Sequence, residues 1–276
     1  MLSSSFSVCM ATYKNDDPEN LRTAINSIYT HQTVKPVEVI LVVDGPIPDS
    51  LRSIISEMTE QIDVLKVIYL EQNMGHAVAR QTGVEAASTP LIALMDADDI
   101  SLPDRFEKQL EIFKQYPEVS VVGGLIHEFV GEPSNVLGIR RCPQEDQEIK
   151  TYLKSRCPMN QMTVMFRKMD IMSVGGYQDW YCEEDYYLWI RLTLAGYRFF
   201  NLQENLVNAR VDERTYQRRG GYRYFKSEAR LQKFMFSQNL ISCWRYMYNV
   251  VIRLAVQVLM PNVVRGWIFQ KFARSK

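Results

Sequence analysis

The amino-acid sequence predicts an α/β protein with a doubly wound, mostly parallel sheet flanked by helices, followed by a basic helical extension. Three observations predict this fold. Short apolar runs alternate with segments of helical periodicity, the connections between them are short, and two of the apolar runs end on aspartates. Such alternation is typical of parallel sheets covered by helices. At 276 residues the chain could form one large α/β domain or two small ones.

The elements follow one another in a regular order. Each apolar run is short enough for a buried strand, and the segments between runs repeat their apolar residues at helical spacing. The expected strands are residues 5–10, 37–43, 64–70, 91–95, 119–125 and 161–167. The expected helices are residues 18–30, 49–60, a segment opening near Gly75, 104–115 and 186–192. Residues 131–160 contain scattered Pro and Gly, so we expect an irregular segment there.

The run at residues 91–95 is the expected centre of the sheet. Five apolar residues in a row indicate a strand that is buried on both faces. Asp96, Asp98 and Asp99 follow it and must lie at its mouth, because an unpaired buried charge costs several kcal/mol. Asp44 ends the strand at residues 37–43. Because open α/β sheets bind ligands at this edge, the fold would bring the four aspartates together.

The acidic turn has two interpretations. Crowded carboxylates attract a hard cation such as Mg²⁺, which favours a metal site that receives a phosphate-bearing ligand. Alternatively, the turn is a solvated cap of the next helix. A calcium loop counted from Asp96 is excluded, because its sixth position is Ser101 where Gly is required. A zinc site is excluded by the wide separation of His31, His76 and His127.

A second acidic group stands at the start of the predicted helix at residues 186–192. Glu183, Glu184 and Asp185 are consecutive and precede two tyrosines. Carboxylates at a helix N-terminus suit the helix dipole, which is a purely structural role. Carboxylates beside aromatic rings can also hold a general base. The residues alone leave both interpretations open.

Composition and charge set broader limits. The hydrophobic content of 46% and charged content of 23% are typical of a globular protein. The five cysteines are scattered and odd in number, which indicates reduced thiols in the cytosol. We expect no signal peptide and no membrane span. Residues 1–209 hold 18 Lys and Arg against 29 Asp and Glu, whereas residues 210–276 hold 14 against 3. The excess of basic residues at 210–276 suggests an anionic partner. Nucleic acid is a poor candidate, because residues 1–209 are acidic and contain no nucleic-acid recognition motif.

Two features of the basic end remain open. The run of basic residues at 210–228 is either a solvated face or a contact for diphosphate, for which arginine is well shaped. Residues 243–260 are apolar except for one polar residue at every fourth position: Arg245, Asn249, Arg253 and Gln257. This helix would either pack on the preceding domain or lie among lipid headgroups, with Trp267 and nearby arginines as anchors.

Together the motifs resemble the inverting glycosyltransferases of family 2, which have the GT-A fold, and within it the bacterial enzymes of O-antigen and exopolysaccharide synthesis. The resemblance covers residues 6–210 and rests on the order of the motifs. They are Ala11-Thr12-Tyr13, Asp44, the run from Asn73 to Gly83 that contains Arg80, Asp96-Ala97-Asp98-Asp99, Gly175-Gly176-Tyr177 and Glu184-Asp185 followed by Leu188-Trp189. It implies a GT-A domain at residues 1–210 and a basic helical extension at 211–276.

The resemblance also implies a role for each matching residue. A nucleotide-sugar would be bound by Ala11, Thr12, Tyr13, Asp44, Arg80, Asp96 and Ala97. Mg²⁺ or Mn²⁺ would be coordinated by Asp98, with support from Asp99. Asp185 would take the proton from the acceptor hydroxyl, in a setting shaped by Glu184. In such a reaction the metal neutralises charge on the departing nucleoside diphosphate, and the base lies on the opposite face of the sugar.

The implied function is transfer of a sugar, from a UDP-sugar in particular, to a saccharide carried on a polyprenyl diphosphate, with formation of a β-linkage. The implied place is the cytoplasmic face of the inner membrane, where the protein would be peripheral. Two alternatives stay open from the sequence. One is a non-catalytic, membrane-associated protein that binds nucleotide-sugars. The other is a metal-dependent nucleotidyltransferase, which would usually show a glycine-rich basic signature near its first strand.

Overall fold

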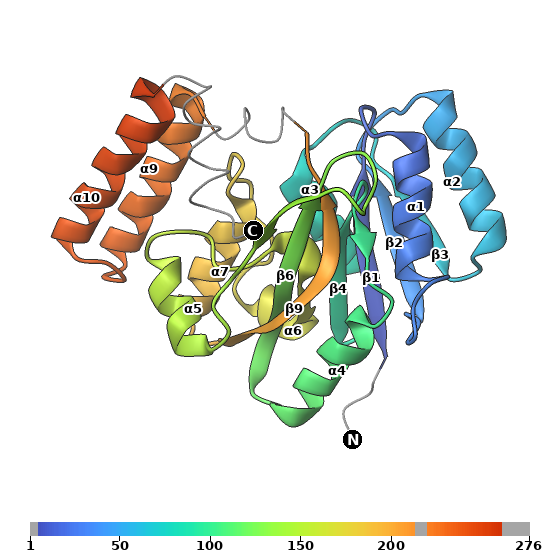
Figure 1. Ribbon diagram of the computed structural model, residues 1–276, viewed down its shortest axis with the longest axis horizontal. Coiled ribbons are helices and arrows are strands. Elements are labelled where there is room, and N and C mark those ends of the chain that lie inside the picture. Colours follow the sequence, from blue (N-terminus) through green and yellow to red (C-terminus); the bar gives the residue numbers. More distant parts are fainter. Residues whose placement is uncertain (1–4, 213–219, 261–276) are drawn as a thin grey trace.

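The computed structural model describes residues 5–212 and 220–260, and its strands form one sheet in the order β3-β2-β1-β4-β8-β6-β9-β5, with β7 paired to β6 (Figure 1). The strands are β1 (Phe6–Thr12), β2 (Glu38–Val43), β3 (Leu65–Tyr69), β4 (Leu91–Asp96), β5 (Ile100–Ser101), β6 (Val119–Phe129), β7 (Val136–Arg140), β8 (Met165–Arg167) and β9 (Arg198–Arg210). The helices are α1 (Pro18–Ile28), α2 (Asp49–Gln61), α3 (His76–Ala86), α4 (Arg105–Gln115), α5 (Asp146–Leu153), α6 (Lys168–Ser173), α7 (Glu184–Leu194), α9 (Tyr222–Ser237) and α10 (Cys243–Leu254).

The first half of the sheet is parallel, as the alternation of strands and helices predicts. β1 lies between β2 and β4, with Cys9 opposite Ile40 on one side and Leu94 on the other. β3 continues the parallel set beyond β2. The carboxyl ends of β1, β2 and β4 therefore meet at one edge, and Asp96 at the end of β4 lies opposite Ala11 of β1.

The second half of the sheet is mixed, so the sheet departs there from the parallel pattern of its first half. β8 runs antiparallel to both β4 and β6, while β6 and β9 are parallel. The short strand β5 and the strand β7 also pair in the antiparallel sense. The α/β class and the mostly parallel arrangement are confirmed.

Two apolar layers cover the sheet because successive side chains of a strand point to opposite faces. In β1, Val8 and Met10 belong to the layer that includes Leu21 of α1 and the aromatic residues of α4. Cys9 belongs to the opposite layer, with residues of α3 and α7. β2 and β4 are apolar along most of their length because both of their faces are buried.

Several elements differ from the sequence expectation. Residues 131–160 contain β7 and α5 rather than irregular chain, and residues 161–167 divide into a 3₁₀ turn (Gln161–Thr163) and β8. The long strand β9 was not expected, because polar residues interrupt its apolar pattern. One of them, Asn201, is fully buried and donates hydrogen bonds to the carbonyl oxygens of Pro143 and Pro158 at 2.7 and 3.2 Å.

The two C-terminal helices stand beside the sheet, with α10 at the outer edge of the molecule (Figure 1). α9 packs against the layer formed by α7, and α10 packs on α9. Within the described residues, no helix has both the length and the apolarity required to cross a bilayer. The basic residues between 213 and 219, and Trp267, lie outside the described residues.

Candidate functional site

A cleft of about 1050 Å³ opens at the carboxyl ends of β1, β2 and β4, where β9 also ends. We call it the central cleft. Nine of the eleven residues predicted to act in the site line it: Ala11, Thr12, Tyr13, Asp44, Arg80, Asp96, Ala97, Asp98 and Asp99. The other two, Glu184 and Asp185, begin α7 and do not line the cleft themselves. Their connection to it runs through Arg80.

The loop after β1 is shaped by Asp16. The Asp16 carboxylate accepts hydrogen bonds from the Thr12 hydroxyl at 2.9 Å and from the Tyr13 backbone N–H at 3.0 Å. The next residue, Asp17, caps α1 by accepting from the backbone N–H groups of its first turn. Thr12 is buried, whereas Tyr13 is partly exposed and its ring lies 6.4 Å from that of His76. The loop therefore offers a fixed aromatic side chain at the cleft wall.

Asp44 is tied to the loop that leads into α3. Its carboxylate accepts from the backbone N–H groups of Met74 and Gly75 at 2.6 and 2.9 Å, and from the Asn73 amide at 3.0 Å. Gly45 has a φ of +87°, and a Cβ there would lie 2.5 Å from the Asn73 backbone nitrogen. Only glycine fits this position. Asp44 thus holds two loops of the cleft together while it lines the wall.

The acidic turn after β4 divides its three aspartates between cleft and core. Asp98 is exposed, whereas Asp99 is only 2% exposed and accepts a hydrogen bond from the Arg210 backbone N–H at 2.8 Å. The Arg210 side chain donates in turn to the Asp98 carbonyl oxygen at 3.2 Å. The turn is therefore fastened to the end of β9, and Asp98 is its most exposed carboxylate in the cleft lining.

The electrostatics of this turn favour a cation. Desolvation at the cleft wall raises the pKa of Asp98 to about 6, and the negative charges of Asp96 and Asp16 contribute to that rise. Burial and the negative charges of Asp98 and Asp96 also raise the pKa of Asp99. Within residues 5–212 and 220–260, no three His, Cys, Asp or Glu side chains converge to form a complete metal site. The donor set fits a Mg²⁺ or Mn²⁺ ion whose remaining ligands are water and phosphate oxygens.

A buried arginine lies behind the acidic turn, and sequence reasoning missed it. Arg105, the first residue of α4, is fully buried and donates to the Leu94 carbonyl oxygen at 2.7 Å and to Gln109 at 3.1 Å. Burial lowers its pKa to about 9, while the charges of Asp96 and Asp99 oppose that change. A buried cation at this point offsets part of the repulsion among the aspartates.

Arg80 bridges the acidic turn to the start of α7. Its guanidinium donates to Asp96 at 3.0 Å and to Glu184 at 2.6 Å. The side chains of Arg80 and Glu184 are 12% and 13% exposed, so this contact is largely shielded from water. Residues that lie 104 positions apart in the sequence are thereby held in one place. Either carboxylate would lose its compensating charge if Arg80 were removed.

Asp185 lies next to this bridge. It is partly buried, its carboxylate accepts from the Tyr186 backbone N–H at 2.6 Å, and the Cys157 thiol lies 3.7 Å away. Burial raises the pKa of Asp185 and the Glu184 charge raises it further, while Arg80 and Arg140 oppose the rise. Both arginines also line the central cleft. Asp185 is therefore a carboxylate of raised pKa just behind the cleft wall.

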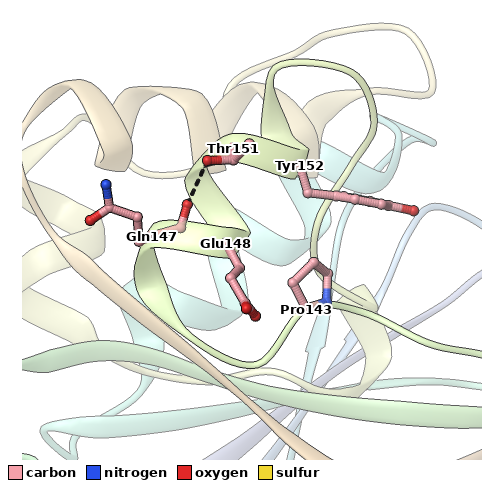
Figure 2. Close-up of a pocket in the computed structure, with 5 residues that line it drawn as sticks. All are labelled: Pro143, Gln147, Glu148, Thr151 and Tyr152. Atoms are coloured by element: carbon pink, nitrogen blue, oxygen red, sulfur yellow. Dashed lines mark hydrogen bonds between the residues drawn. The ribbon is translucent and has the colours of Figure 1, made fainter.

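A second hollow has a different character. It measures about 300 Å³ and lies over α5, lined by Pro143, Gln147, Glu148, Thr151 and Tyr152 (Figure 2). Figure 2 shows that its one internal hydrogen bond is the helical contact from the Thr151 hydroxyl to the Gln147 carbonyl oxygen. The lining of this second hollow contains a single carboxylate, Glu148, and no basic side chain. The central cleft is the stronger candidate site.

We predict that Arg80→Met will lower the free energy of unfolding by about 3 kcal/mol, because it leaves the shielded Glu184 carboxylate and the partly exposed Asp96 carboxylate without their cation. Urea denaturation measures the loss. The matched control is Arg198→Met, since Arg198 pairs with Glu118 at 3.2 Å on an exposed surface. That change should cost less than about 1 kcal/mol. Equal losses in the two variants would contradict a special role for the Arg80 bridge.

Comparison with known proteins gives one consistent result. The chain matches the profile of Glycosyl transferase family 2 over residues 7–172 and that of Glycosyl transferase family group 2 over residues 91–270. It is 36% identical over 269 residues to a UDP-Gal:alpha-D-GlcNAc-diphosphoundecaprenol beta-1,3-galactosyltransferase of Escherichia coli, which covers 98% of this chain and 96% of that protein. It is 32% identical over 266 residues to the amylovoran biosynthesis glycosyltransferase AmsE of Erwinia amylovora, with 96% and 98% covered.

Solved structures agree on the fold. The chain superposes with a TM-score of 0.62 and 14% identity on the mannosyltransferase PcManGT of Pyrobaculum calidifontis in complex with GDP-Man and Mn²⁺. The match covers 96% of this chain and 78% of that one. At this identity the similarity concerns the fold alone.

Proposed function

The chain belongs to glycosyltransferase family 2, and we propose that it transfers a sugar from a UDP-sugar to a saccharide linked to a polyprenyl diphosphate, with inversion to a β-linkage. Glycosyltransferase activity in polysaccharide biosynthesis follows from the family and from the relatives. The E. coli relative is named as an enzyme that uses UDP-Gal and a diphosphoundecaprenol-linked acceptor, which supports the UDP donor and the lipid-linked acceptor proposed here. The family argues against the nucleotidyltransferase alternative.

The bridge from Asp96 through Arg80 to Glu184 is the observation that carries this proposal. An inverting displacement needs one group at the leaving diphosphate and another on the opposite face of the sugar. The bridge joins an acidic turn at the strand edge to a second acidic group at the start of α7. Arg80 lines the central cleft and contacts both groups, which would place both near a donor bound there.

Each part of the cleft has a proposed role. The Tyr13 loop and Asp44 would hold the base and ribose, and Ala97, which is buried, would let the donor approach the turn closely. Asp98, supported by Asp99, would hold a divalent cation, which would neutralise charge on the departing diphosphate. Arg80 would orient Asp96 toward the sugar and ribose. Asp185 would accept the proton of the attacking hydroxyl, with Glu184 and Arg80 setting its charge.

The alternative of a non-catalytic binder predicts that a UDP-sugar binds but is never consumed. We expect turnover when the protein is given a panel of UDP-sugars and a synthetic lipid diphosphate carrying one sugar. Addition of EDTA should lower the rate at least about tenfold, and Mn²⁺ or Mg²⁺ should restore it, because the carboxylates alone cannot offset the leaving charge. Product is followed by mass spectrometry. Full activity in EDTA would contradict the metal role, and binding without turnover would favour the alternative.

The same reaction implies a location. An acceptor carried on a polyprenyl chain stays in the membrane, so the enzyme would act as a peripheral protein on the cytoplasmic face of the inner membrane. The division into a catalytic domain at residues 1–210 and an extension at 211–276 belongs to this proposal.

A further inference from the structure

Helix α10 turns its polar side toward the rest of the protein. Asn249, only 3% exposed, donates to the side chain of Gln232 of α9 at 2.8 Å and to the Lys154 carbonyl oxygen at 2.9 Å. One turn later, Arg253 donates to the Ser155 carbonyl oxygen at 2.6 Å. The polar stripe that repeats at every fourth residue is therefore the inward face of the helix.

The contacts with α9 complete this inward face. Arg253 forms an ion pair with Glu228 at 3.1 Å, and the side chain of Gln257 also donates to the Glu228 carboxylate. Glu228 is 9% exposed and Gln257 is 6% exposed. Hydrogen bonds and an ion pair thus help to fix the orientation of α10, together with the stacking of Tyr246 on Phe236 of α9, whose ring centroids lie 5.4 Å apart.

The outward face of α10 and the turn that follows it is apolar. We call it the α10 apolar face; its members are Trp244, Met247, Tyr248, Val251, Ile252, Leu254, Val258 and Leu259. The most exposed are Trp244 at 82%, Leu259 at 73% and Val251 at 57%. A helix on a water-exposed surface normally buries its apolar side and presents its polar side. The inverted arrangement indicates that this face meets a non-aqueous partner.

The net charge of the two C-terminal helices favours an anionic partner. α9 carries exposed Arg223, Lys226, Arg230 and Lys233. Within residues 220–260 the one acidic residue is Glu228, which is buried in its ion pair with Arg253. The exposed charge of the two helices is therefore positive throughout that segment. Two copies of the chain would bring like charges together, whereas an anionic lipid surface would attract them.

The exposed aromatic residues suit the same partner. Trp244 and Tyr248 lie near the start of α10, and the rings of such residues prefer the boundary between lipid tails and water. Aliphatic side chains follow along the helix. An apolar stripe with aromatic and basic neighbours is the pattern of helices that lie in the plane of a membrane.

α9 also contacts α7 and the loop that precedes it. The Ser227 hydroxyl of α9 donates to the Tyr181 carbonyl oxygen at 2.6 Å, and the Trp180 indole donates to the Ser227 carbonyl oxygen at 3.3 Å. The ring of Phe234 packs edge-on against Tyr187 of α7 at 5.1 Å. α9 therefore supports the loop and helix that carry Glu184 and Asp185.

We propose that the α10 apolar face docks onto an anionic lipid bilayer, with the cations of α9 drawn to its phosphate headgroups. The proposal rests on the proposed function for its biological reason, since a lipid-linked acceptor must be reached at a membrane. Docking through helices that pack on α7 would hold the start of α7 near the membrane surface, where the diphosphate end of such an acceptor lies.

The test compares the full-length protein with the triple variant Trp244→Gln, Val251→Gln, Leu259→Gln. Co-sedimentation is measured with vesicles of phosphatidylcholine alone and of phosphatidylcholine mixed with phosphatidylglycerol. The control variant carries Val37→Gln, Tyr69→Gln and Met169→Gln, which remove similarly exposed apolar side chains elsewhere, at 53%, 53% and 75% exposure. We expect the wild type and the control to bind the anionic vesicles, and the triple variant to bind at least about tenfold more weakly.

Three results would overturn the proposal. The first is equal vesicle binding by the triple variant and the wild type, and the second is no binding by the wild type. The third is a dimer of the wild type in analytical ultracentrifugation that the triple variant does not form. A second copy of the chain would then cover the α10 apolar face. Transfer to a short-chain, water-dispersed acceptor is measured in parallel. If no transfer occurs while vesicle binding follows the expected pattern, the proposed function fails and the docking surface stands.

Discussion

Asp185→Asn is expected to lower kcat by about 10²–10⁴-fold while donor binding changes little. Loss of a positioned general base has effects of this size, because the amide cannot accept the proton of the attacking hydroxyl. The side chains are nearly equal in size, so the hydrogen bond from the Tyr186 backbone N–H can persist. The rate is measured at saturating donor and acceptor, and donor affinity is measured by calorimetry with UDP.

The matched control for this change is Asp179→Asn. Asp179 is exposed and precedes α7 in the same segment, so its substitution should leave kcat within about twofold. An Asp185→Asn variant that keeps the wild-type rate would show that another group takes the proton.

The same assignment has a consequence for pH. Only the ionised carboxylate can act as base, and burial together with Glu184 raises the pKa of Asp185 above its ordinary value. Activity should therefore be present above that raised pKa and be lost as pH falls through it. Arg80 opposes the rise, so Arg80→Met should move the acid limb of the kcat profile to higher pH.

Asp98→Asn is expected to lower kcat/KM by about 10²–10³-fold, because it removes the carboxylate that would hold the cation where negative charge develops on the leaving group. Unlike the change at Asp185, it should also weaken the binding of UDP in the presence of Mn²⁺. Calorimetry with and without Mn²⁺ separates the two effects. We expect Mn²⁺ to strengthen UDP binding in the wild type and to have little effect on the variant.

Glu111→Gln is the control for Asp98→Asn, since Glu111 is an exposed carboxylate on the nearby helix α4. It should match the wild type in both assays. Mn²⁺-dependent binding that survives in Asp98→Asn would mean that the ion is held elsewhere.

The centre of the fold could be predicted because its residues have one physical interpretation. A run of apolar residues such as β4 can only be buried, and the aspartates after it can only lie at its end. The first-loop residues, Asp44 and the acidic turn therefore reach one cleft, as parallel strands require. Their roles as ligands of a donor and a metal remain predictions.

Other parts of the fold and the site could not be predicted, because they depend on contacts between residues far apart in the sequence. β9 is interrupted by polar residues, and the side-chain amide nitrogen of Asn201 within it donates to the carbonyl oxygens of distant prolines. Arg105 is an ordinary helix residue in the sequence, and its burial beneath the acidic turn becomes visible only in the fold. The sequence shows an aspartate at position 16, but it does not show that this carboxylate accepts hydrogen bonds from Thr12 and Tyr13 and so holds their loop.

The acidic start of α7 and the last helix show how the structure separates alternatives. The sequence left the carboxylates before α7 as either dipole partners or a catalytic group. Glu184 proves to be paired with Arg80 across the site, which a dipole role alone does not require. For α10, the sequence left packing and membrane contact open. The inward polar stripe shows that α10 packs on the protein and still presents an apolar face.

The most direct test of the central claim is a crystal structure of Asp185→Asn with an intact UDP-sugar and Mn²⁺, in which slow turnover preserves the donor. The account predicts the diphosphate and the ion at Asp98 and the sugar between the acidic turn and the start of α7, with residue 185 on the face opposite the diphosphate. A donor bound outside the central cleft, or residue 185 on the same face as the leaving group, would contradict it.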